Sequence, residues 1–316
     1  AHILGYVPLF TTDTPHAYSY FHVSGLHYFT VSCVLIPSLS VMWYRQRRAL
    51  GLMMSSSEWS RYIDVGLCTA AAVLLPILLV SRFQLIFSVL LAGMTYICIN
   101  GGVLPFRINL RAIMLAAAGF LLLILLYVFI TYERAHSIDY LNGIFEMKYD
   151  LPIFISQPYI YIANNFDNFN CLVEALTEHT QGLRLLFPFF ALTGMKFTHP
   201  ELVVFPIYVT KEELTTVTLL YDAYYDFGVI GTAVFSFVIG AVMACIGRYT
   251  ESHGEDAMIV RFIYAQLNFY LLFAFFTTWF SNPTTWFYII ASAAIGIFIK
   301  MYTLLMHKRT DTVREA

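Results

Sequence analysis

The residues best suited to chemistry fall in one polar stretch, residues 132–226, which holds most of the acidic residues of the chain. Arg184 offers a planar fork of donors that matches the oxygens of a phosphate or carboxylate group. His179 is a candidate acid or base, because burial and neighbouring charges can tune its pKa. Asp222 and Asp226 are four residues apart and would share one face of a helix. Together these types can bind an anion and move a proton.

The spacing of apolar residues predicts an amphipathic helix over residues 172–187, stopped by the proline at position 188. This helix would place His179 on its apolar face, as either a packing histidine or an acid/base residue beside a substrate. Arg184 lies well around the helix, so both side chains can touch one ligand only if the helix bends at Gly182 or the ligand is large. Alternatively, Arg184 is a surface residue whose guanidinium bonds lipid phosphates.

A second cluster, residues 159–170 (YIYIANNFDNFN), combines aromatic rings with amides. Aromatic faces stack on sugar rings and amides bond hydroxyl groups, so the cluster suits a carbohydrate groove. It suits equally an aromatic belt at a membrane interface. A third segment, residues 215–226 (TTVTLLYDAYYD), adds tyrosines beside the two aspartates. The candidate binding residues from these segments and from the start of the polar stretch are Arg134, Tyr161, Asn165, Asn168, Asp222 and Tyr225.

The composition excludes an ordinary soluble protein, since 59% of residues are hydrophobic, 12% are charged and the mean hydropathy is +0.68. An all-α, polytopic bundle of transmembrane helices is therefore expected, with nucleic acid excluded as a partner. The histidines and cysteines show no metal-ligand spacing, so neither a metal nor another cofactor is expected.

Seven apolar stretches are long enough to cross a bilayer, given that roughly 20 residues are needed. They form one membrane domain with a large external loop, residues 132–226, which should contain short helices. Because residue 1 already reads as part of an external loop, further spans are expected before it. The predicted spans lie near residues 27–43, 63–80, 85–100, 112–131, 227–246, 259–280 and 287–306.

Basic residues of the short connections fall on one side of the membrane if the spans alternate, which is typical of a cytoplasmic face. The polar stretch is then on the outer side, where Arg82 is the only basic residue in a short turn. The residues on the cytoplasmic side are Arg45, Arg47, Arg48, Arg61, Arg107, Arg111, Arg248, Lys308, Arg309 and Arg314.

The order of several short motifs resembles that of integral-membrane oligosaccharide repeat-unit polymerases of the O-antigen type. These motifs are a Gly-x-x-Pro-Leu-Phe segment at residues 5–10, an arginine at position 107 after two glycines, and a threonine-rich run that ends in Asp226-Phe227-Gly228-x-x-Gly231. The large external loop lies between the second and the third of them. The resemblance extends over nearly the whole chain.

This resemblance implies a metal-independent glycosyltransferase in the bacterial cytoplasmic membrane, with its site on the outer face. It would polymerise polyprenyl-pyrophosphate-linked oligosaccharide repeat units for surface polysaccharide synthesis. Arg184 or Arg134 would hold the leaving pyrophosphate, and His179 or Asp226 would serve as base. Membrane lipids, a chain-length regulator and a flippase are the implied partners.

Two other functions stay open at this stage. A ligase-like transferase would use the same donor with a different acceptor. A polysaccharide flippase or other transporter would place charges and repeats within its spans. The spans hold few charges, Asp64, Arg261 and Lys300, and the polar mass is external, which favours an enzyme.

Overall fold

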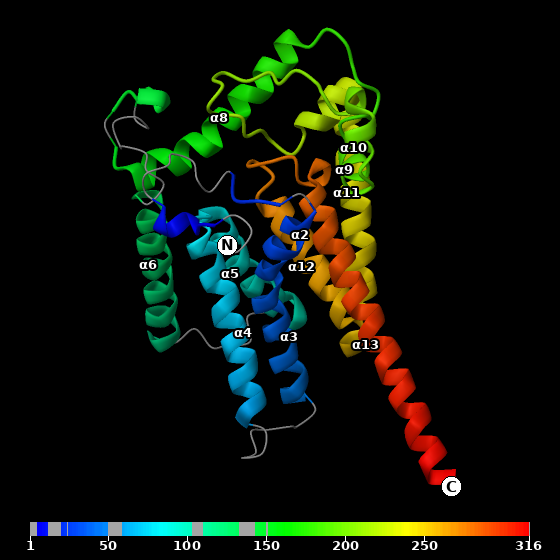
Figure 1. Ribbon diagram of the computed structural model, residues 1–316. Coiled ribbons are helices and arrows are strands. Elements are labelled where there is room, and N and C mark those ends of the chain that lie inside the picture. Colours follow the sequence, from blue (N-terminus) through cyan, green and yellow to red (C-terminus); the bar gives the residue numbers. More distant parts are fainter. Residues whose placement is uncertain are drawn as a thin grey trace.

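Long apolar helices make up the fold, and no strand occurs in the described part of the chain (Figure 1). The computed structural model describes residues 5–11, 20–23, 25–49, 59–102, 110–132, 143–149 and 151–315. The helices of the bundle are α2 (Leu26–Val31), α3 (Ile36–Ala49), α4 (Trp59–Leu78), α5 (Arg82–Ile99), α6 (Leu110–Tyr132), α11 (Tyr221–Ser252), α12 (Met258–Leu272) and α13 (Pro283–Glu315). The polar segment adds α8 (Ile153–Ala175), α9 (Phe187–Leu192) and α10 (Met195–Thr198). Short 3-10 turns are η1 (Pro8–Phe10), η2 (Ser32–Leu35), η3 (Pro200–Leu202), η4 (Gly254–Ala257) and η5 (Trp279–Ser281).

Five of the described helices are long and apolar enough to cross a membrane, which confirms the expected all-α class and identifies a multi-pass membrane protein. They are Leu26–Ala49, Trp59–Leu78, Arg82–Ile99, Tyr221–Ser252 and Pro283–Tyr302. The predicted span at residues 112–131 is helical as α6. The predicted span at residues 259–280 is helical only to Leu272, so α12 has 15 residues.

The early end of α12 has a local cause. Backbone turns replace the helix from Phe273 onward, and the carbonyl of Ala274 accepts a hydrogen bond of 2.7 Å from the amide of Leu219. The aromatic rings of Phe273 and Phe276 then pack on Phe83 of α5, with ring centroids 6.3 and 4.8 Å away. Tertiary contacts therefore end a helix whose composition alone would continue it.

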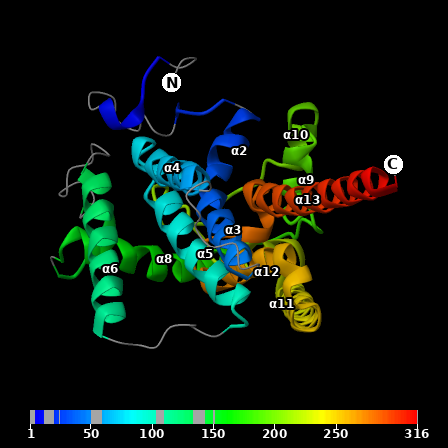
Figure 2. The same ribbon diagram turned by 90° about the horizontal axis from the view of Figure 1, so that it is seen from below.

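Helix α12 lies near the centre of the bundle and packs against α5, α11 and α13 (Figure 2). Its buried aromatic residues meet Phe87 and Trp279 in one cluster. A polar contact links it to α13, where Gln266 donates to the Ser292 hydroxyl at 2.7 Å. In a membrane such close packing and buried hydrogen bonds hold helices together, because lipid is as apolar as the side chains.

The two ends of the bundle differ in character. At one end Arg261 donates to the carbonyls of Ile99 and Thr250, and Arg45 donates to Asn100. These contacts join the ends of α3, α5, α11 and α12. The polar segment, including α8, lies at the opposite end (Figure 1).

Helix α11 is broken near its start at Gly228, where φ is 65° and ψ is −149°. This backbone conformation is essentially restricted to glycine. A Cβ at Gly228 would also lie 3.0 Å from Nε2 of His179. At Gly231 a Cβ would lie 2.5 Å from the carbonyl oxygen of Ala223, because the broken first turn folds back on the helix. Both glycines of the Asp-Phe-Gly-x-x-Gly motif are thus required by the break.

We predict that Gly228→Ala lowers the free energy of unfolding by about 1–3 kcal/mol, because alanine cannot adopt this backbone conformation without strain. The measurement is thermal or denaturant unfolding of the purified protein in detergent. Gly240→Ala is the matched control, since Gly240 lies in the same helix with nothing within 4 Å of its Cβ position. That control should be neutral or slightly stabilising. Equal stability of Gly228→Ala and Gly240→Ala would contradict the break.

Candidate functional site

Residues 176–186 form a loop, called here the docking loop, that covers the break in α11. The structure shows that the helix predicted over residues 172–187 is wrong: α8 ends at Ala175, and the docking loop has turns. Its amides bond elsewhere, with Thr180 donating to the carbonyl of Tyr225 (3.3 Å) and Gln181 to that of Asp226 (3.1 Å). An unbroken α11 would use those carbonyls for residues 229 and 230. The loop therefore satisfies the acceptors that the break releases.

Asp226 fastens the docking loop from the other side. Its carboxylate is fully buried and accepts hydrogen bonds from the Thr180 hydroxyl (2.5 Å) and the amides of Arg184 (3.1 Å) and Leu185 (2.8 Å). These three donors stabilise its negative charge. Because these bonds occupy the carboxylate and Asp226 is not among the residues that line the cavity beside Arg184, Asp226 is a positioning residue.

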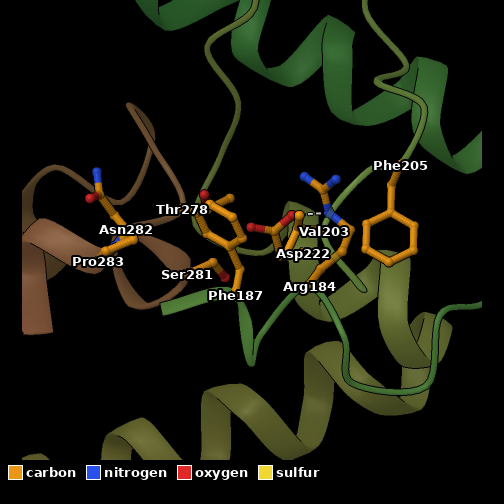
Figure 3. A pocket seen from close by; sticks show the side chains of 9 residues that line it. All are labelled: Arg184, Phe187, Val203, Phe205, Asp222, Thr278, Ser281, Asn282 and Pro283. Carbon is orange, nitrogen blue, oxygen red and sulfur yellow. Dashed lines mark hydrogen bonds and ion pairs between the residues drawn. The ribbon is translucent and has the colours of Figure 1, made fainter. Parts of the chain in front are cut away.

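Arg184 leaves the docking loop toward Asp222 on the first turn of α11. Its Nε donates to Oδ1 of Asp222 at 2.5 Å, and its guanidinium lies over the ring of Tyr225 with 4.7 Å to the centroid. Among the described residues, Nη1 and Nη2 have no hydrogen-bond partner, and Figure 3 shows them pointing away from Asp222. The ion pair and the ring therefore fix a guanidinium whose outer edge remains available.

This edge opens on a cavity of about 360 Å³ at the N-terminus of α13 (Figure 3). Asn282 caps α13 by accepting from the amide of Thr284 at 2.9 Å. The Ser281 hydroxyl is buried and has no hydrogen-bond partner within the described part of the chain. The cavity is lined by Arg184, Phe187, Val203, Phe205, Asp222, Thr278, Ser281, Asn282 and Pro283.

The electrostatics of this cavity suit an anion. The N-terminus of a long helix carries partial positive charge, and α13 has 33 residues. The guanidinium adds two donors and the Ser281 hydroxyl a third. Asp222 balances part of the positive charge, and its second oxygen, Oδ2, has no hydrogen bond to the described residues. One cavity thus combines anion donors with a carboxylate able to accept a proton.

His179 does not line this cavity. Its side chain is exposed on the outer side of the docking loop, where Nδ1 lies 3.1 Å from the carbonyl oxygen of Tyr225. The ring contacts Tyr224 edge-on with centroids 6.1 Å apart. The prediction that His179 lies on the buried apolar face of a helix is therefore wrong: the residue is in a loop, its side chain is exposed, and it contacts the carbonyl of Tyr225 and the ring of Tyr224.

The amides predicted to line a groove are instead buried inside the polar segment. Asn168 donates to the carbonyls of Leu214 (2.7 Å) and Thr216 (2.8 Å), and Asn165 donates to the carbonyl of Phe275 (2.7 Å). Neither amide can contact a ligand without losing these bonds. They fasten the chain before α11, and the turn after α12, to α8.

The two tyrosines among the candidates are also held by protein contacts. Tyr225 donates its hydroxyl to the carbonyl of Pro206 at 3.2 Å, and Tyr161 packs edge-on against Phe276 with centroids 5.7 Å apart. Arg134 lies outside the described residues. Tyr159 and Asp167, from the same run in α8, do line an open groove of about 640 Å³ with Tyr149 and Lys211.

Three residues that matter in the structure were not among the sequence candidates for a site. Ser281 and Asn282 precede Pro283, and a proline at the first position of a helix is a recognised start signal. Arg82 is 7% exposed at the start of α5, and it had stood out only as the single basic residue of its turn. Among the described residues no group of three potential metal ligands occurs.

Comparison of the chain with models of protein families, with curated proteins and with solved structures found no match. The helices of the described residues define the class, an all-α multi-pass membrane protein.

We predict that Asp226→Asn loosens the docking loop, because an amide group cannot accept from Thr180 and two backbone amides at once. Loss of charge-assisted bonds at a buried site costs about 1–3 kcal/mol. Hydrogen exchange of residues 180–186 should accelerate, measured by mass spectrometry in detergent. Asp222→Asn is the control, since it removes the ion pair and keeps the bonds of Asp226. Unchanged protection in Asp226→Asn would refute the positioning role.

Proposed function

We propose that the protein is a membrane glycosyltransferase that polymerises polyprenyl-pyrophosphate-linked oligosaccharide repeat units. The observation that supports this most directly is the outer edge of the Arg184 guanidinium in a cavity at the N-terminus of α13, at the polar end of a membrane bundle. A pyrophosphate attached to a membrane lipid is an anion that can reach a cavity at this end of the bundle. The motif order described above is the second support.

In the proposed reaction a hydroxyl oxygen of one repeat unit attacks the anomeric carbon of the growing chain. The bond between that carbon and the pyrophosphate oxygen breaks, and its electron pair leaves with the lipid pyrophosphate. The proton of the attacking hydroxyl passes to a base. The developing charge on the leaving group is the feature that an enzyme must stabilise most.

The residues of the cavity divide these tasks. Arg184 binds the leaving pyrophosphate through Nη1 and Nη2, with the Ser281 hydroxyl and the N-terminus of α13 as further donors. Asp222 is the proposed base, because its Oδ2 is the free carboxylate oxygen in the cavity. Asp226 acts through the backbone of the docking loop, and we do not assign the proton transfer to His179.

The groove along α8 is the proposed path of the sugar chain. Tyr149 and Tyr159 offer aromatic faces, and Asp167 and Lys211 offer charged hydrogen-bonding groups. This placement keeps the hypothesis of a carbohydrate groove for residues 159–170 but with Tyr159 and Asp167 of that segment, joined by Tyr149 and Lys211 from outside it. The site would face the outside of the bacterial cytoplasmic membrane, where a flippase delivers repeat units and a chain-length regulator acts.

We predict that Arg184→Ala abolishes polymer formation, because loss of one such electrostatic contact lowers the rate about a hundredfold. The purified protein is incubated with one lipid-linked repeat unit, and products are separated on a gel. Wild type should give a ladder. Arg184→Lys should recover little, since lysine lacks the second terminal nitrogen.

Lys196→Ala is the matched control, because it removes a cation of α10 that does not line the cavity. It should keep the full ladder. A wild-type ladder in Arg184→Ala would refute the role of this residue. A single product on a separate acceptor would indicate a ligase, and translocation without new bonds would indicate a transporter.

The proposed orientation predicts that a cysteine at position 178 reacts with an impermeant thiol reagent in intact cells, whereas one at position 251 does not. Both residues are exposed: Glu178 lies in the docking loop of the polar segment, and Glu251 lies at the C-terminal end of α11. The polar segment and the C-terminal end of α11 are at opposite ends of the bundle (Figure 1). Labelling of Glu251→Cys from outside, with protection of Glu178→Cys, would invert the orientation.

A further inference from the structure

A second cavity, of about 360 Å³, lies beneath α8 between α5, α6 and the turn after α12. Most of its lining is apolar or aromatic, with Phe83, Ile86, Tyr161, Ile162, Phe273 and Phe276 among its residues. One charged side chain, Arg82, also lines it. The cavity therefore combines an apolar body with a cation.

The guanidinium of Arg82 is buried without a carboxylate partner among the described residues. Its Nη1 donates to the hydroxyl of Thr131 at 2.9 Å and to the amide oxygen of Gln157, and the group lies 5.2 Å from the ring centroid of Tyr127. These partners are neutral. Nε and Nη2 have no hydrogen bond to any residue that the structure describes.

Burying a charge whose described partners are all neutral costs free energy. The position of Arg82 in its helix increases this cost. Arg82 is the first residue of α5, where the helix dipole already places positive charge. An anion in the cavity would relieve both effects. The apolar lining requires that the same ligand carry a hydrocarbon part, which describes a lipid with a phosphate group.

We propose that this cavity binds the polyprenyl chain of a lipid-linked repeat unit, with Arg82 bonded to its phosphate. The choice of an isoprenoid rests on the proposed function. Polymerisation joins two lipid-linked molecules, so two anionic head groups must be bound at once. The cavity at Arg184 holds the pyrophosphate that is displaced from the growing chain. The cavity at Arg82 holds the pyrophosphate that remains attached to the attacking repeat unit.

The two faces of α8 are consistent with this arrangement. Pro158, Tyr161 and Ile162 line the apolar cavity, whereas Tyr159, Ala163 and Asp167 line the groove that also contains Glu146 and Lys211. Residues three or four apart in each set share a face of the helix. One helix thus separates a place for lipid from a place for sugar, as a lipid-linked saccharide needs.

The test measures lipid binding by native mass spectrometry with polyprenyl phosphate, uncharged polyprenol and phosphatidylglycerol as probes. Every variant in this experiment also carries Arg184→Ala, so that Arg184 in the first cavity does not contribute to the measured lipid binding. Polyprenyl phosphate should bind this protein about tenfold or more tightly than polyprenol, the usual size of a hydrogen bond to a charged group.

Gln157→Glu supplies an internal carboxylate to Arg82 without changing side-chain size, so it should remove the preference for phosphate while keeping thermal stability. Asn170→Asp is the matched control, because it adds the same charge to an exposed position of α8. Ile86→Trp fills the apolar part and should weaken both isoprenoids alike.

Unchanged discrimination in Gln157→Glu would overturn the role of Arg82. Equal binding and competition by phosphatidylglycerol would overturn the isoprenoid assignment in favour of an ordinary membrane lipid. None of the probes carries a sugar, so these outcomes are independent of whether the protein forms polymer, and failure of the proposed function would appear only in the product ladder.

Discussion

The site depends on the break in α11 at Gly228 and on the loop that repairs it. Breaking a helix releases backbone acceptors that cannot stay unpaired away from water. The docking loop supplies the missing donors, and the carboxylate of Asp226 then binds two of its amides. This exchange of hydrogen bonds holds the backbone of Arg184 against Asp226, and the side chain of Arg184 then pairs with Asp222. An arginine on a free loop would lose side-chain entropy on binding an anion, whereas this one is already in place.

The same polar end carries three features with separate chemistry. The cavity at Arg184 has donors suited to a pyrophosphate, the groove over α8 has groups suited to sugars, and the cavity under α8 has an apolar body with a buried cation. The buried amides of Asn165 and Asn168 hold α8 where it separates the last two. Their role is architectural, and it explains why an amide-rich run can lie beside a binding groove without lining it.

Hydropathy was sufficient to predict the class and most of the spans, because the bilayer demands long apolar helices whatever the tertiary contacts are. The helix expected over residues 172–187 failed for the opposite reason. The apolar residues of this segment do have a helical period. However, hydrogen bonds from the docking loop to the broken helix, 40 or more residues later in the chain, outweigh the local preference for helix. The local sequence does not indicate these hydrogen bonds. Arg184 and Asp222 could be predicted as site residues from their residue types. The Ser281 hydroxyl and the buried state of Arg82 depend on packing between distant helices.

The proposed function requires that the outer edge of Arg184 binds the pyrophosphate of a lipid-linked sugar. The most direct measurement is an experimental structure of the protein bound to a non-hydrolysable polyprenyl-pyrophosphate sugar. We expect the pyrophosphate in the cavity at the N-terminus of α13, with its oxygens within hydrogen-bond distance of Nη1 or Nη2 of Arg184. A pyrophosphate bound elsewhere while this cavity stays empty would contradict the claim.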